Sequence, residues 1–163
     1  MDDLHSIIIR NDIRSGDIGY LIYLHGLLYS KEYDLDIYFE SYVAIHLSKF
    51  AIEKTDIERI WIIEQDRIIK GSIAIVKGDD NTAQLRWYLL HPDLRGIGLG
   101  KKLINEAIAF SRENGYKSIF LWTLSILTQA TRLYESAGFR LTEEITHNIW
   151  GRELTEQRYD LSL

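Results

Sequence analysis

Apolar positions along the chain follow two different periods, and the change between them separates helices from strands. After a short apolar run at 6–11 (SIIIRN), apolar residues recur at helical spacing from 15 to 30 and again from 37 to 50. Ser15 is a residue type that commonly caps a helix at its N-terminus. The pattern therefore predicts one short strand followed by two helices.

Three runs rich in β-branched and aromatic residues follow, at 58–66, 67–77 and 82–92. Turn-forming residues separate them, first Gln65-Asp66 and then the segment KGDDN. Short turns between such runs predict an antiparallel meander of three strands.

The second half of the chain alternates helical and strand patterns. Helical spacing begins at Leu99 and stops near Asn114-Gly115, a pair typical of a left-handed helix end. The almost wholly apolar segment 117–124 predicts a buried strand, parallel to the strand at 82–92 through a βαβ crossover. A helix at 128–138 and two strands joined by a loop at 147–152 complete the pattern.

The predicted order is β-α-α-β-β-β-α-β-α-β-β. It indicates the α/β class in its mixed α+β form, with a twisted, mostly antiparallel central sheet of about seven strands and helices on both faces. The chain has 163 residues and no low-complexity linker, so we expect a single domain, 1–163.

Composition narrows the function classes. The chain has no Cys, which excludes disulfides, thiolate zinc sites and acyl transfer through a cysteine. The net charge is −5, with the acidic surplus in the first 60 residues, which disfavours nucleic acid as a partner. No uninterrupted apolar run approaches the length of a membrane span, so we expect a cytoplasmic protein without a membrane partner.

The segment HPDLRGIGLGKKL, at 91–103, carries glycines at alternate positions just before a predicted helix. Backbone N–H groups at such a position form an anion site, which glycines leave open to a phosphate. The loop is not a dinucleotide fingerprint, because its spacing is GxGxG and the next strand ends without an acidic residue. It is not a P-loop either, because Arg95 and Lys102 occupy the positions where a P-loop needs Gly and Ser or Thr. The pattern that remains is Arg-x-x-Gly-x-Gly.

A second motif, ATRLYESAGFRL at 130–141, follows one helix and one strand later. Together the two motifs resemble the GNAT superfamily of N-acetyltransferases, most strongly over 85–141. Within it, LRWYLLHP and THNIWGREL are similar to the acetyltransferase domain that often follows a MarR-type DNA-binding domain.

The resemblance implies acetyl-CoA as the donor, without a metal. It implies that Leu89 and Leu90 face the pantetheine arm, that the pyrophosphate lies against the backbone of the glycine loop, and that Tyr134 donates a proton to the departing sulfur. A phenol stays protonated at neutral pH and suits that role. The implied cofactor residues are Leu89, Leu90, Arg95, Gly96, Ile97, Gly98, Leu99, Gly100, Lys101, Ala130 and Tyr134.

The general base is where the chain departs from the superfamily. Many members carry Glu on the strand before the loop, at the position that aligns with Gln84, and an amide cannot take up the proton. Leu127 likewise replaces a common Asn. Candidates for the base, directly or through water, are Glu40, Glu32, His25 and His147, of which we expect Glu40.

The acceptor pocket is predicted between the first two helices and the late loop. Six of the ten tyrosines lie between positions 20 and 42, beside acidic residues, which suits a cationic amine. The expected substrate-binding residues are Tyr29, Tyr33 and Glu32, with His147, Asn148 and Trp150 on the other side.

The predicted activity is direct transfer of an acetyl group from acetyl-CoA to a small-molecule amine, an amino acid or a polyamine-like compound. Two alternatives stay open: acetylation of a protein lysine or N-terminus, and acyl-CoA binding without turnover. The resemblance also allows a homodimer.

Overall fold

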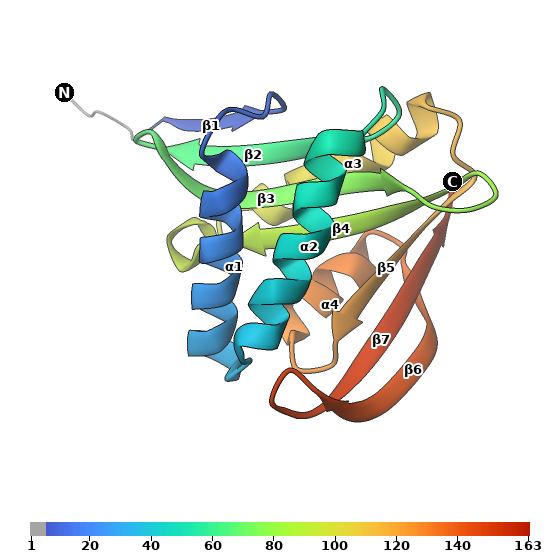
Figure 1. Cartoon of the computed structure of the whole chain (residues 1–163). Coiled ribbons are helices and arrows are strands. Elements are labelled where there is room, and N and C mark those ends of the chain that lie inside the picture. The colour runs from blue at the N-terminus through green and yellow to red at the C-terminus, as the bar shows by residue number, and fades with distance from the viewer. Residues whose placement is uncertain (1–5) are drawn as a thin grey trace.

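The computed structural model describes residues 6–163, in which the strands and helices follow the predicted order (Figure 1). The elements are β1 (Ile7–Arg10), α1 (Asp17–Tyr33), α2 (Ile37–Glu53), β2 (Arg59–Gln65), β3 (Ile68–Lys77), β4 (Thr82–Leu90), a 3-10 turn (Pro92–Leu94), α3 (Leu99–Glu113), β5 (Ser118–Leu124), α4 (Thr128–Ser136), β6 (Arg140–Ile149) and β7 (Arg152–Ser162).

The strands form one seven-stranded sheet in the order β1-β2-β3-β4-β5-β7-β6. All neighbours are antiparallel except β4 and β5, which are parallel. At the turn between β2 and β3, Asp66 and Arg67 both adopt positive φ, as tight hairpins require. The predicted meander and the single parallel crossover are confirmed.

Helices cover both faces of the sheet, as predicted: α1 and α2 lie on one face and α3 on the other (Figure 1). Alternate residues of β2 enter the two cores, Ile60 and Ile62 on the α1 and α2 side, Trp61 and Ile63 on the α3 side. Because both faces are covered, most positions of the central strands β3, β4 and β5 are apolar.

The expected cap at the start of α1 is wrong. Gly16, with φ of 94°, occupies the N-cap position, and no side chain caps the helix. Asp17 instead accepts hydrogen bonds from the Arg14 amide (2.6 Å) and the Arg10 guanidinium (2.8 Å). An ion pair with β1 thus fixes this helix end, a long-range contact that local sequence does not reveal.

The loop predicted at 147–152 is shorter in the structure. His147 and Asn148 belong to β6, and only Trp150 and Gly151 form the turn into β7. Both turn residues have positive φ, 53° and 91°, which closes a two-residue hairpin.

A β-bulge interrupts the pairing of β3 with β4. One residue separates Ser72 from Ala74, whereas two separate their partners Leu89 and Arg86. Trp87, inside the bulge, has φ of 47°, and its carbonyl accepts a hydrogen bond from the Ser72 hydroxyl at 2.6 Å. A bulge of this kind re-aims the side chains that follow it.

β4 leaves its parallel neighbour before it reaches the bulge. The two strands pair only between Thr82–Gln84 and 118–120. From there they diverge toward their C-terminal ends, as Figure 1 shows. Within residues 6–163, the second half of β4 therefore has no backbone partner on its β5 side.

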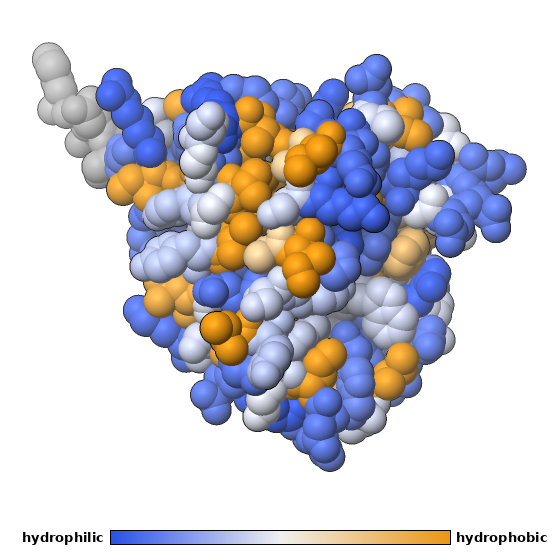
Figure 2. Space-filling view, in the orientation of Figure 1, coloured by the Kyte–Doolittle hydropathy of each residue, from blue (hydrophilic) through white to orange (hydrophobic). Residues whose placement is uncertain are grey.

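The outer face of the helical layer is mixed in polarity. Figure 2 shows apolar patches among polar surface on this side, and Ile37, Ile45 and Ile52 of α2 stay exposed. None of the helices within residues 6–163 is long and apolar enough to cross a membrane.

The contact of β3 with the end of β4 gives a testable prediction. A Cβ on Gly71 would lie 2.5 Å from the Leu89 carbonyl oxygen. We expect Gly71→Ala to lower the free energy of unfolding by about 1–3 kcal/mol, because backbone must shift to make room. Gly19, inside α1, has nothing within 4 Å of such a Cβ. Gly19→Ala should raise the stability by about 0.5–1 kcal/mol in the same urea titration; equal effects of the two changes would contradict the prediction.

Candidate active site

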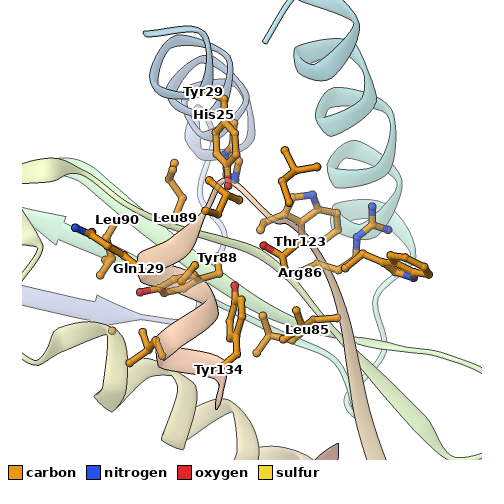
Figure 3. A pocket seen from close by; sticks show the side chains of 18 of the residues that line it. His25, Tyr29, Leu85, Arg86, Tyr88, Leu89, Leu90, Thr123, Gln129 and Tyr134 are labelled. Atoms are coloured by element: carbon orange, nitrogen blue, oxygen red, sulfur yellow. The ribbon is translucent and has the colours of Figure 1, made fainter. Parts of the chain in front are cut away.

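The divergence of β4 and β5 opens into a cavity of about 570 Å³. Its lining comes from α1, α2, β4, the loop before α3 and the start of α3, β5, α4, the β6–β7 turn and β7. In Figure 3, His25 and Tyr29 enter it from α1, whereas Tyr88 and Tyr134 lie on the opposite side, from β4 and α4.

One end of the cavity is the glycine loop. Among the described residues, the amides of 96–101 have no hydrogen-bond acceptor, and the first intrahelical bond runs from Lys102 N to Gly98 O at 3.2 Å. Gly96 and Gly98 have φ of 77° and 83°, and a Cβ on either would meet nothing within 4 Å. Such a row of free N–H groups at a helix N-terminus forms a site for an anion.

The loop residues predicted from sequence divide into two groups. Arg95, Gly96, Gly98, Gly100 and Lys101 line the cavity, together with Leu89, Leu90, Ala130 and Tyr134. The side chains of Ile97 and Leu99 are not part of the lining: the first is 60% exposed and the second is buried in the core beneath α3.

The Arg95 side chain joins the loop to α1. Its Nε donates to the Leu90 carbonyl at 2.9 Å, and its guanidinium forms a bidentate ion pair with Glu32, with Nη2 2.9 Å from Oε2. Glu32 therefore reaches the cavity, but its charge is already balanced by Arg95.

Tyr134 lies where α4 meets the cavity. Its ring packs against Tyr88 and Phe139, each with a centroid 6.0 Å away, and the residue is 5% exposed. Burial raises the pKa of the Tyr134 phenol well above its ordinary value. Its hydroxyl has no hydrogen-bond partner among residues 6–163, so a protonated donor faces the cavity.

His25 also lines the cavity and is only 2% exposed. Its Nδ1 lies 2.7 Å from the Leu21 carbonyl oxygen, so Nδ1 carries the proton. Nε2 is buried without a partner in the described residues. Burial lowers the pKa of His25 to about 4, so at neutral pH the imidazole is uncharged and Nε2 is a free acceptor.

The other candidate bases lie elsewhere. The structure does not bring Glu40 into the cavity lining, because its carboxylate packs against the Gly26 backbone of α1. His147 likewise stays outside, with its Nε2 2.6 Å from Oε2 of Glu156. It is Glu156 that reaches the cavity.

An aromatic wall connects α1, α2 and the β6–β7 turn. Ring centroids lie 5.6 Å apart for Tyr29 and Tyr33, 4.5 Å for Tyr29 and Phe39, 5.1 Å for Phe39 and Trp150, and 5.5 Å for Tyr42 and Trp150. The predicted grouping of the helical tyrosines with the late turn is thus present in the cavity.

Sequence reasoning missed several lining residues. Arg86, Tyr88, Thr123 and Glu156 all reach the cavity. Arg86 carried a usable signal, a charged residue between apolar neighbours in the central strand segment LRWYLL. The others lie within strand patterns that have no feature to single them out.

Comparison with known proteins identifies the family. Residues 26–139 match the model of the acetyltransferase (GNAT) family. The chain is 31% identical over 97 residues to human N-acetyltransferase 8B, covering 56% of this chain and 43% of that protein. It is 34% identical over 85 residues to the Danio rerio N-acetylaspartate synthetase, covering 52% and 30%. The chain thus spans less than half of either relative.

Solved structures share the fold. A GNAT-family acetyltransferase from Staphylococcus aureus Mu50 superposes with a TM-score of 0.80 at 21% identity, over 97% of this chain and 99% of that one. The structure of yncA from Salmonella typhimurium, solved with its cofactor acetyl-CoA, gives 0.69 at 21% identity, over 96% and 94%. With the matched family model spanning most of its length, the chain belongs to the GNAT family of acetyltransferases.

Proposed function

We propose that the chain transfers an acetyl group from acetyl-CoA directly to the amine of a small molecule. One observation carries the proposal: the row of unpaired amides at 96–101 and the Tyr134 hydroxyl open into the same cavity. The amides suit the pyrophosphate of a CoA thioester, and the Tyr134 hydroxyl suits its sulfur.

The glycine loop and the free edge of β4 fit the donor. The amides of 96–101 and the positive end of the α3 dipole would hold the pyrophosphate. The stretch of β4 that leaves β5 would offer unpaired backbone to the pantetheine amides, with Leu89 and Leu90 along it. Acetyl-CoA supplies the activated acyl group.

Tyr134 would supply the proton that leaves with the thiol. Attack by the amine nitrogen forms the C–N bond, the C–S bond breaks, and the thiolate takes up the phenolic proton. The raised pKa keeps this phenol protonated throughout the neutral range. Proton return from solvent restores it.

His25 is the group that we assign to the incoming amine, in place of Glu40. His25 lines the cavity and its buried Nε2 has no partner among residues 6–163, whereas Glu40 is held between α1 and α2. Because its pKa is near 4, His25 would accept a hydrogen bond that orients the amine, and water would carry the proton away.

The aromatic wall favours a small acceptor over a peptide segment. Rings from α1, α2 and the β6–β7 turn enclose the side of the cavity away from the glycine loop. Release of free thiol from acetyl-CoA with a panel of amines tests the proposal. Tight CoA binding without amine-dependent thiol release would instead support a binding domain without turnover.

Removing the Tyr134 hydroxyl tests the acid. Tyr134→Phe should lower kcat about 100-fold, since general acid catalysis is lost, while the Kd for CoA stays nearly constant. Tyr116→Phe is the control, because Tyr116 bonds the Ile57 carbonyl and lies outside the cavity lining. Steady-state thiol release and calorimetry provide the two readouts; an unchanged kcat would remove Tyr134 from the mechanism.

A matched pair of glycines tests the loop. Gly98 and Gly115 have φ of 83° and 79°, and neither has an atom within 4 Å of its Cβ position. Gly98→Val and Gly115→Val should therefore cost similar stability, but only the first should raise the Kd for CoA, by about 10-fold or more, because it fills the anion site. Equal CoA affinity of both variants would argue against the pyrophosphate assignment.

The buried state of His25 has a measurable pH signature. Its pKa is about 4 in the folded chain against 6.5 in the unfolded one, so the unfolded state binds the proton more tightly. The free energy of unfolding should then fall as pH drops from 6.5 toward 4, by about 3 kcal/mol from this group.

His25→Gln should lose that part of the pH dependence in urea titrations at several pH values. His46→Gln is the control, because His46 makes the same ring contact to a carbonyl four residues earlier but is only partly buried. If wild type and His25→Gln lose stability in parallel on acidification, His25 is not held neutral by burial.

A further inference from the structure

Arg86 is a cation on the acceptor side of the cavity. It lies on β4 just after the last residue that pairs with β5. Its Nη2 donates to the Tyr42 hydroxyl at 3.2 Å, and its guanidinium carbon lies 4.7 Å from the Trp87 ring centroid. These neutral contacts position the group and leave most of its five N–H donors unused.

No carboxylate balances this charge. Within residues 6–163, Arg86 forms no ion pair, and burial lowers its pKa. The two carboxylates of the cavity lining are engaged elsewhere, Glu32 with Arg95 and Glu156 with His147. A half-buried guanidinium without a counter-ion is costly to keep unless a ligand completes it.

The acidic residues near the helical tyrosines do not form a site for a cationic acceptor. Asp36 caps α2 by accepting from the Tyr38 amide at 3.0 Å, and Glu40 packs against Gly26. Neither belongs to the cavity lining. A polycationic acceptor would therefore meet the unpaired Arg86, with Glu32 ion-paired to Arg95 and Glu156 hydrogen-bonded to His147. This is contrary to the polyamine-like acceptor that the sequence allowed.

We propose that Arg86 binds a carboxylate of the acceptor, so that the substrate is a small amine that also carries an acid group, as in an amino acid. The inference rests on the proposed acetyl transfer and narrows its acceptor. A guanidinium fork matches a carboxylate in a bidentate geometry, and the aromatic contacts with Tyr42 and Trp87 hold the fork in place.

Acceptors that differ only in the acid group test this site. L-leucine, L-phenylalanine, L-lysine and L-glutamate would each be compared with its α-carboxamide, and spermidine would serve as a carboxylate-free polyamine. Thiol release gives kcat/KM, and calorimetry on the CoA-saturated chain gives binding. For the preferred amino acid, kcat/KM of the free acid should exceed that of its amide by at least ~10-fold, the effect expected of a charge-assisted hydrogen bond.

Variants assign the preference to Arg86. Arg86→Met should reduce the ratio of kcat/KM for the acid to kcat/KM for the amide to near 1. Arg86→Lys should keep part of this preference because the charge remains. Arg112→Met, at an exposed position in the last turn of α3, should leave the ratio unchanged.

The outcomes separate the two proposals. Binding of acids that depends on Arg86 but gives no thiol release would refute acetyl transfer and support the carboxylate site at Arg86. If the amides or spermidine react as well as the acids, or if the preference for acids survives in Arg86→Met, the carboxylate site at Arg86 is refuted while acetyl transfer stands. Failure of every acid to bind or react better than its amide would also overturn the Arg86 assignment.

Discussion

The candidate active site depends on one constraint, the early separation of two parallel strands. β4 and β5 share only three residue pairs before they diverge. Just after this point the bulge at Trp87 bends β4, and the Ser72 hydroxyl bonded to the Trp87 carbonyl holds the bulge in place. Backbone groups that would otherwise complete the sheet are left facing a cavity, where an extended ligand can pair with them.

The surrounding layers turn this gap into a site with distinct ends. At one end, the amides that open α3 have no acceptor among residues 6–163, an arrangement that favours an anion. At the other, aromatic rings of α1 and α2 meet the β6–β7 turn. Between them, burial keeps Tyr134 protonated and His25 neutral, so a proton donor and a hydrogen-bond acceptor coexist in one cavity without a charge on either.

Much of the fold was predictable because it is encoded locally. The strand and helix periods, the turn residues and the βαβ crossover each depend on short segments. The N-terminal end of α1 was not predictable, because the ion pair between Arg10 and Asp17 joins two elements. The bulge was not either, since nothing in LRWYLL distinguishes it from regular alternation.

The sequence by itself determined the element order, because local periodicity sets it. Glycine spacing pointed to the loop at 91–103, and the resemblance of ATRLYESAGF to the family motif pointed to Tyr134. Only the tertiary structure decided which charges remain available in the cavity. Glu32 and Arg95 are 63 residues apart and neutralise each other, and Glu40 packs against Gly26. Arg86 forms no ion pair with any residue of the described part of the chain, 6–163. Pairing between distant side chains is a property of the fold, so composition could suggest an acidic pocket where the packed chain presents a cation.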